Sequence, residues 1–277
     1  MNAARNIAVV TGASSGIGAE LAQALAARDY HVVAVARRVE RLKEPCQRIS
    51  SAGGECTAVA ADLRSLVDRE RVAATLEPNA QRVEVLINNA GLGTHGFFRD
   101  TDLERELELI DVNCAAVVHL TKRLLPWMLA RQRGYIMNLA SVAAFQPGPV
   151  MALYYASKAF VLSFSEALSE ECEGTGVVVS ALCPGTIPTE FQQRAGIASS
   201  APPAYASKMS ARDVAEMGLE QMFAGKRVFV PAARNRLAIF VNRFLPRRAI
   251  VKAVRKIQEG RLPAGQRSEI EGQSERR

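Results

Sequence analysis

The chain has 277 residues, 48% of them hydrophobic, which suits one large α/β domain, and no run approaches the roughly 18 apolar residues of a membrane span. Its net charge of +7 is unevenly spread, because residues 226–277 carry 14 basic and 4 acidic side chains, a net +10, which leaves −3 on residues 1–225. We therefore expect no nucleic-acid partner for the body of the protein, and the region before the first apolar run lacks the architecture of a signal peptide.

Short apolar runs alternate with longer helical patterns along the chain. In chain order we expect a strand at 7–10, a helix at 17–28, strands at 32–36 and 57–60, a helix at 65–76, a strand at 85–88, a helix at 102–131, a strand at 135–139, a helix at 155–173, a strand at 177–182, a helix at 211–224 and a strand at 228–230. Most of these strands are apolar throughout, which is typical of parallel strands covered on both faces. The alternation predicts an α/β fold, a Rossmann-like doubly wound parallel sheet of seven strands with helices on both faces.

The first strand leads into the glycine-rich turn TGASSGIG, Thr11–Gly18. The five residues from Gly12 also fit G-x-S-x-G, the turn that presents the nucleophilic serine of a hydrolase. A hydrolase would need a histidine at the loop end of a later strand, and His31, His95 and His119 are not so placed. Backbone N–H groups in such a turn, at the start of a helix, suit the phosphates of a dinucleotide instead, and no Gly-Lys-[Ser/Thr] of a Walker loop follows.

Further motifs follow this turn in a characteristic order. They are N-N-A-G at Asn88–Gly91, a serine at Ser141, Y-x-x-x-K at Tyr154–Lys158 and P-G at Pro184-Gly185. Together with the glycine turn they resemble the classical short-chain dehydrogenase/reductase family over roughly residues 5–231. The resemblance implies a catalytic domain at 1–232. Beyond it, the composition predicts a basic amphipathic helical extension at 233–259 and a disordered tail at 260–277.

The end of the second predicted strand bears on the choice of cofactor. An NAD-selective enzyme would place a carboxylate near Ala36 to hold the ribose 2′-hydroxyl, and none is present. Arg37 and Arg38 follow, and two guanidiniums suit a 2′-phosphate, although a solvated pair at a helix start is the alternative. We therefore expect NADP(H) in preference to NAD(H).

The resemblance also assigns the other cofactor contacts. Those implied are the glycine turn (Gly12, Ser14, Ser15, Gly16, Ile17 and Gly18), Asp62 and Leu63 at the adenine, Asn89, Ala90 and Gly91 at the adenosine ribose, and Tyr154, Lys158, Pro184, Gly185, Ile187 and Thr189 toward the nicotinamide.

A tyrosine and a lysine four residues apart share one helix face, and a nearby ammonium lowers the pKa of a phenol, which suits the pair to acid–base work on a carbonyl or alcohol. Tyr155 is three residues from Lys158, so the spacing alone does not exclude it; the resemblance selects Tyr154. It also implies that Ser141 binds the substrate oxygen and that Asn113 helps hold a water that relays protons beyond Lys158. Histidine and cysteine show no ligand spacing, so no metal is expected.

The expected pocket walls are apolar, with no fixed charge placed to grip a carboxylate. They comprise Leu92, Phe97, Val142, Phe145, Met151, Phe191 and Tyr205. This favours a hydrophobic carbonyl or alcohol, such as an oxo-acyl, steroid-like or long-chain ketone or aldehyde. Residues 186–209, rich in Gly, Ser and Pro, could act as a lid.

The segment 235–258 alternates apolar and basic residues and breaks at Pro246. It could lie on a membrane surface, fold over the substrate mouth or form an oligomer contact. We expect the protein to be a cytoplasmic homodimer or homotetramer, with peripheral membrane contact through this segment as an alternative. We expect its five scattered cysteines to be reduced thiols. Two rival functions are a cofactor-binding regulator without turnover and a membrane-surface adaptor.

Overall fold

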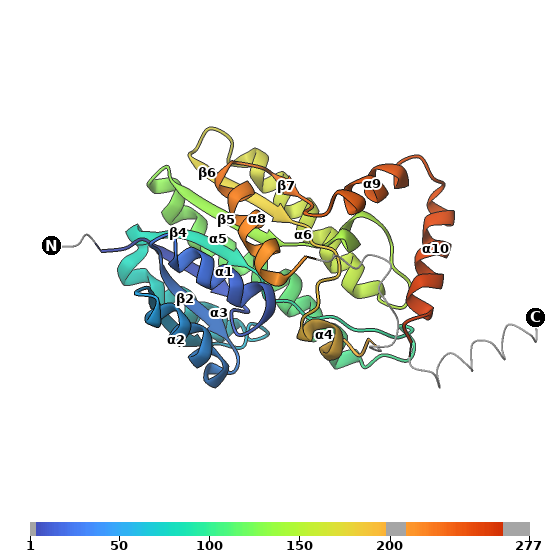
Figure 1. The fold of residues 1–277 in the computed structure, drawn as a ribbon, viewed down its shortest axis with the longest axis horizontal. Coiled ribbons are helices and arrows are strands. Elements are labelled where there is room, and N and C mark those ends of the chain that lie inside the picture. Colours follow the sequence, from blue (N-terminus) through green and yellow to red (C-terminus); the bar gives the residue numbers. More distant parts are fainter. Residues whose placement is uncertain (1–3, 198–208, 263–277) are drawn as a thin grey trace, which may run out of the picture.

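The computed structural model describes residues 4–197 and 209–262. At its centre lies a parallel sheet of seven strands in the order β3-β2-β1-β4-β5-β6-β7 (Figure 1). The strands are β1 (Ile7–Thr11), β2 (His31–Ala36), β3 (Glu55–Ala60), β4 (Val83–Asn88), β5 (Gly134–Leu139), β6 (Val177–Leu182) and β7 (Val228–Phe229). The predicted doubly wound sheet is confirmed, and its order reverses between β1 and β4, where ligands bind in such folds.

Alternate residues of the central strands enter two separate cores. Ala8 and Val10 of β1 face one side, where they meet Leu21 and Leu219. Val9, between them, faces the other side. This period of two explains why the strands read as unbroken apolar runs.

Helices cover both faces of the sheet (Figure 1). The first face carries α1 (Gly16–Ala26), α2 (Lys43–Ser51) and α8 (Ala211–Phe223). The second carries α3 (Leu66–Leu76), α5 (Ala116–Ala130) and α6 (Ala152–Glu171). The remaining helices are α4 (Leu103–Ile110), α7 (Glu190–Arg194), α9 (Ala233–Asn242) and α10 (Arg247–Glu259).

The helix expected over 102–131 is interrupted. Between α4 and α5 the backbone forms a π-helical turn, Asp111–Ala115, which contains Asn113. The turn widens the helix and changes the direction in which this asparagine points, a feature that often accompanies functional sites.

The expectation that all cysteines are reduced is wrong for one pair. Cys46 on α2 and Cys56 on β3 form a disulfide, with their Cα atoms 5.2 Å apart. Our sequence analysis predicts no helix over residues 39–51, so it does not place Cys46 against β3.

The C-terminal segment forms two helices on either side of Pro246, and they have different surroundings (Figure 1). On α10, Val254 packs in a cluster with Tyr155 and Met151, so this helix closes over one end of the sheet. The tail boundary predicted at residue 260 is too early, since Leu262 is fully buried. Among the described residues, none of the helices is both long and apolar enough to cross a bilayer.

Candidate active site

One cavity of about 300 Å³ lies at the carboxyl ends of the strands and gathers most of the predicted site. Its walls include Gly12, Ser14, Ser15, Gly16, Ile17, Arg37, Arg38, Asp62, Leu63, Asn89, Ala90, Gly91, Ser141, Tyr154, Lys158, Pro184, Gly185, Ile187 and Thr189. Two predicted residues, Gly18 and Asn113, do not line the cavity. They contact residues that do, since Gly18 packs against Gly12 and Asn89, and Asn113 binds Leu92.

The glycine turn packs directly on the loop that follows β4. The Asn89 amide donates to the carbonyls of Thr11 at 2.8 Å and Gly12 at 3.2 Å. A Cβ at Gly18 would lie 2.3 Å from the Asn89 Nδ2 and 2.4 Å from the Gly12 oxygen, so only glycine fits there. Gly18 therefore allows the two loops to approach, which is a different role from the direct phosphate contact that the resemblance implies.

The start of α1 faces this cavity without a side-chain cap. Ser15 occupies the N-cap position, but its hydroxyl makes no capping hydrogen bond to the helix. Gly16, at φ +57°, turns the chain into the helix. The first N–H groups of α1 and the hydroxyls of Ser14 and Ser15 therefore suit a diphosphate.

At the far end of the cavity, Arg37 and Arg38 are exposed at the end of β2. No acidic side chain follows Ala36 directly. This end of the cavity fits an adenosine that carries a 2′-phosphate.

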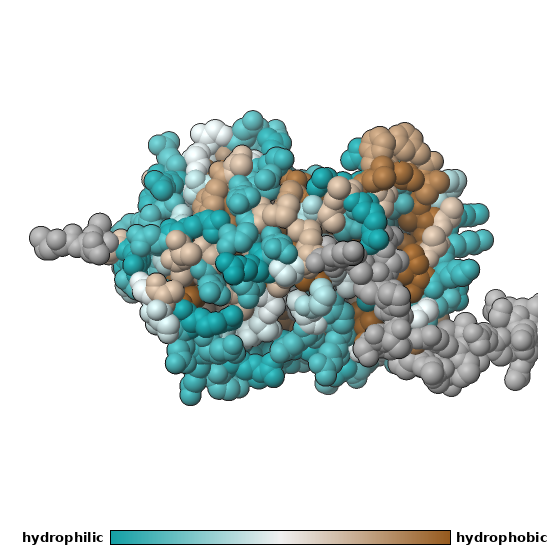
Figure 2. All heavy atoms as spheres, in the orientation of Figure 1, coloured by the Kyte–Doolittle hydropathy of each residue, from teal (hydrophilic) through white to brown (hydrophobic). Residues whose placement is uncertain are grey.

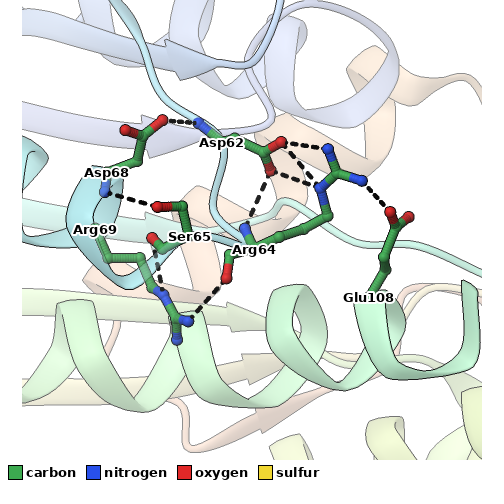
Figure 3. Close-up of polar contacts among 6 residues, drawn as sticks. All are labelled: Asp62, Arg64, Ser65, Asp68, Arg69 and Glu108. Atoms are coloured by element: carbon green, nitrogen blue, oxygen red, sulfur yellow. Dashed lines mark hydrogen bonds and ion pairs between the residues drawn. The ribbon is translucent and has the colours of Figure 1, made fainter. Parts of the chain in front are cut away.

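The Asp62 carboxylate takes part in a network of ion pairs (Figure 3). It accepts two hydrogen bonds of 2.9 Å from the Arg64 Nε, and Arg64 also pairs with Glu108 of α4. The hydrogen bonds from Arg64 hold the pKa of Asp62 below its usual value. The Asp62 N–H donates to Asp68 at 2.7 Å. The network fixes the turn after β3, so that Asp62 and Leu63 line the adenine end of the cavity.

Ser141, Tyr154 and Lys158 converge at the other end. Ser141 lies two residues beyond the end of β5. Tyr154 and Lys158 lie one turn apart on α6, with the Lys158 Nζ 5.9 Å from the centre of the Tyr154 ring. The Lys158 Nζ donates to the Leu139 carbonyl at 2.7 Å. Burial lowers the pKa of Lys158 to about 8.

The Tyr154 phenol differs from the expectation. Burial raises the pKa of Tyr154, while a hydrogen bond with Ser141 and the charge of Arg261 lower it and do not reverse the shift. The net shift is opposite to the lowered pKa that we expected, because desolvation of the phenolate outweighs the hydrogen bond with Ser141 and the charge of Arg261.

The Asn113 side chain is buried and fully engaged. Its Oδ1 accepts from the Leu92 N–H at 2.8 Å, and its Nδ2 donates to the Leu92 carbonyl and the Ser157 hydroxyl, both at 3.0 Å. A Cβ at Gly91 would lie 3.4 Å from the Asn113 Oδ1 and 3.5 Å from the Lys158 Nζ. Asn113 thus clamps the loop after β4 onto α6, beside Lys158.

The substrate end of the cavity is partly as predicted. Leu92, Val142, Met151 and Phe191 line it, whereas Phe97 and Phe145 do not, and Tyr205 lies outside the described residues. Phe191 comes from α7, in the segment predicted to be a lid, and its ring lies 5.3 Å from that of Tyr154. That residues 186–209 act as a lid stays a prediction, and residues 198–208 lie outside the described residues.

The expectation that no fixed charge borders this end is wrong. Arg261 and Gln258 line the cavity, and Arg261 is 8% exposed. Sequence reasoning missed both residues because they follow the resemblance region and no local pattern shows that α10 folds back onto the site. The regular apolar spacing of α10 was the only available signal.

Among the described residues, no group of three or more His, Cys, Asp or Glu side chains is arranged to hold a metal ion.

A dinucleotide-binding sheet with a serine, a tyrosine and a lysine at the nicotinamide end defines an oxidoreductase site. The family model for short chain dehydrogenases matches residues 6–199, and the chain belongs to this family. It is 35% identical to the ketoacyl reductase HetN of a Nostoc strain over 179 residues, which is 65% of this chain and 62% of that protein. It is 33% identical to a putative ketoacyl reductase of Streptomyces coelicolor over 82% of this chain and 84% of that protein. The chain thus spans about three fifths of the length of some of its curated relatives.

Solved structures share the whole architecture. A short-chain dehydrogenase from Sphingobium yanoikuyae in complex with NADPH superposes with a TM-score of 0.78 at 33% identity, over 86% of this chain and 94% of that chain. Similar structures have been solved with NADP and with NAD. The family and fold are therefore settled, and the cofactor preference depends on this chain's own residues.

Proposed function

We propose that the protein is an NADP(H)-dependent oxidoreductase that interconverts a carbonyl and an alcohol on a hydrophobic substrate. The observation that carries the proposal is the convergence of Ser141, Tyr154 and Lys158 at one end of the cavity whose other end holds the glycine turn and Arg37. Its curated relatives include ketoacyl reductases, which supports an oxo-acyl, steroid-like or long-chain ketone or aldehyde as substrate.

When bound, the reduced cofactor supplies a hydride to the carbonyl carbon. The Ser141 and Tyr154 hydroxyls hold the substrate oxygen, and Tyr154 gives it a proton as negative charge develops. The raised pKa of Tyr154 keeps the phenol protonated at neutral pH, as a proton donor requires. Lys158 binds the ribose hydroxyls, and Asn113 positions the loop and helps supply protons beyond Lys158.

We propose the cofactor contacts that the resemblance implies, with one refinement. The hydrogen bond from Arg64 fixes the Asp62 carboxylate before any ligand binds. Asp62 and Leu63 therefore give the adenine a rigid surface to bind against. Arg37 and Arg38 supply the preference for NADP(H).

The sharpest test is Tyr154→Phe, which removes one hydroxyl and keeps the ring. Turnover of a panel of apolar ketones with NADPH should fall at least 100-fold, a range typical of lost acid–base catalysis. NADPH binding, measured by fluorescence titration, should be unchanged. Full activity in Tyr154→Phe would refute the mechanism, and NADPH binding without turnover of any carbonyl by the wild type would favour the regulator.

We propose that the protein forms a homodimer or homotetramer. Apolar side chains remain exposed on α4 and α5, with Leu103 67%, Leu107 55% and Val118 38% accessible. A second copy could bury them. Light scattering at several concentrations tests this, and a strictly monomeric protein would contradict it.

We also propose that α9 contacts membranes from the cytoplasmic side. It and the following turn expose Leu237, Phe240 and Phe244 at 63%, 55% and 73%, and Figure 2 shows a hydrophobic patch at this position. Arg247 and Arg248 flank it and suit anionic lipid. Wild type should sediment with phosphatidylglycerol vesicles more than Phe240→Ser/Phe244→Ser does, and equal sedimentation would contradict the proposal.

A further inference from the structure

The substrate end of the cavity contains a buried positive charge that the shared chemistry does not use. Arg261, just after α10, is 8% exposed and lines the cavity with Gln258. Within residues 4–197 and 209–262 no carboxylate pairs with it, and its Nε is buried without a hydrogen-bond partner. A buried charge without a counter-ion is costly, so its position calls for an anion that arrives with a ligand.

The guanidinium is held in place from one side only. Its Nη1 donates to the Gln258 Oε1 at 3.3 Å, and the Gln258 Nε2 donates to the Tyr155 hydroxyl at 2.8 Å. Tyr155 and Gln258 are themselves buried, at 5% and 2% exposed. These two hydrogen bonds connect Tyr155 of α6 to Arg261 through Gln258 and fix the Nη1 side of the guanidinium. The other guanidinium N–H groups are left for a ligand.

The neighbouring titratable groups supply no negative charge. His95, which binds the Gln258 carbonyl at 3.2 Å, has its pKa lowered to about 4 by burial and by Arg261, so it is neutral near pH 7. Tyr154 and Tyr155 are phenols. Glu190 also lines the cavity, but it pairs with Arg194 and Arg41. Arg261 is thus a positive charge of this wall without a carboxylate partner among the described residues, and a guanidinium remains protonated throughout the neutral range.

We propose that Arg261 forms a carboxylate-binding subsite, and that the substrate is an apolar carbonyl or alcohol with a carboxylate at a distance from the reacting carbon. A planar guanidinium matches a carboxylate in two parallel hydrogen bonds. The surrounding walls, Met151, Phe191 and Ile197, are apolar and suit the body of such a molecule. The inference rests on the proposed function, since it names the substrate class of the same site.

The test compares oxo-carboxylates of increasing chain length with their methyl esters, together with a ketone that has no second polar group. Wild type should prefer the acid of fitting length by about 10- to 100-fold in kcat/KM, the range expected for a charge-assisted hydrogen-bonded pair. Arg261→Gln should abolish this preference, because kcat/KM for the acid should fall by about 10- to 100-fold more than kcat/KM for the plain ketone. Arg261→Lys should keep part of it. Lys252→Gln, on an exposed position of α10, is the matched control and should behave as wild type.

Equilibrium binding gives a second reading that requires no variant. The complex of wild type with NADP+ should bind a fatty carboxylate about 10-fold more tightly than its methyl ester by calorimetry. An equal or weaker affinity for the acid, or an unchanged acid preference in Arg261→Gln, overturns the subsite. If no ketone is turned over at all while the acid still binds through Arg261, the proposed function fails and the subsite stands.

Discussion

Replacing Gly18 with alanine tests whether the glycine turn is fixed by its contact with the loop after β4. The added Cβ would lie 2.3 Å from the Asn89 Nδ2 and 2.4 Å from the Gly12 carbonyl oxygen, well inside contact distance. The Gly12 oxygen belongs to the backbone, so it cannot rotate away. One of the two loops must therefore move.

The cost can be worked from the contacts that this movement breaks. Overpacking costs about 1–3 kcal/mol. The Asn89 amide would also lose its bonds to Thr11 and Gly12, which contribute about 1 kcal/mol each. We expect Gly18→Ala to lower the free energy of unfolding by about 3–5 kcal/mol. Because the Asn89 side chain is only one of the two obstacles, Asn89→Ala should relieve the penalty in part.

Urea unfolding followed by circular dichroism measures this loss, and NADPH titration measures the accompanying weakening of the site. Gly260→Ala is the matched control, since its nearest contacts would be at 3.5 Å. If Gly18→Ala unfolds within 0.5 kcal/mol of wild type, a margin typical of neutral surface changes, and binds NADPH normally, the close approach of the loops is refuted.

Three further perturbations test the same site. Lys158 titrates near 8 when folded and at 10.5 in an unconstrained chain, so unfolding takes up a proton between these pH values and wild-type stability rises with pH across them. Lys158→Met should abolish that rise and should increase the free energy of unfolding at pH 7 by up to about 3 kcal/mol. Urea unfolding at several pH values measures both effects, and a dependence on pH that persists in the variant would contradict the prediction. Arg37→Gln/Arg38→Gln should weaken NADPH binding about 10- to 100-fold and leave NADH binding unchanged, with Lys43→Gln as the surface control. Equal losses for both cofactors would show that the arginines do not read the 2′-phosphate. Asn113→Ala leaves the buried N–H and carbonyl of Leu92 unpaired, so it should lower the unfolding free energy by about 3–5 kcal/mol; a loss of turnover with normal stability would assign this residue to proton relay alone.

Much of the fold could be predicted because the sheet is covered on both faces. Most of the central strands are apolar almost throughout, as in Val32–Ala36. The site could be predicted because its residues follow strand ends or share one helix turn. These are local patterns, and parallel strands bring them to one edge of the sheet.

What could not be predicted depends on contacts between distant segments. Leu42, Cys46 and Ile49 follow a helical spacing of three and four residues, a short signal for α2 that our prediction omits. The pairing of Cys46 with Cys56 depends on how α2 packs on β3, which no local pattern indicates. The π-helical turn at Asn113 keeps the side-chain pattern of an ordinary helix. The burial of Arg261 depends on α10 folding back onto Tyr155, which is one of the three placements that we expected for residues 235–258, and no local pattern chooses among them.

The two ends of the cavity come from different parts of the chain. The family match, residues 6–199, supplies the glycine turn, Ser141, Tyr154 and Lys158. The wall beyond Tyr154 is completed by α10 and Arg261, outside that match. Arg261 also acts on the reacting group itself, since its charge lowers the pKa of Tyr154 against the effect of burial. A carboxylate bound to Arg261 would offset that charge and favour the protonated phenol, the form that donates a proton to a carbonyl. Binding of such a substrate and readiness of the proton donor would then be linked through one guanidinium.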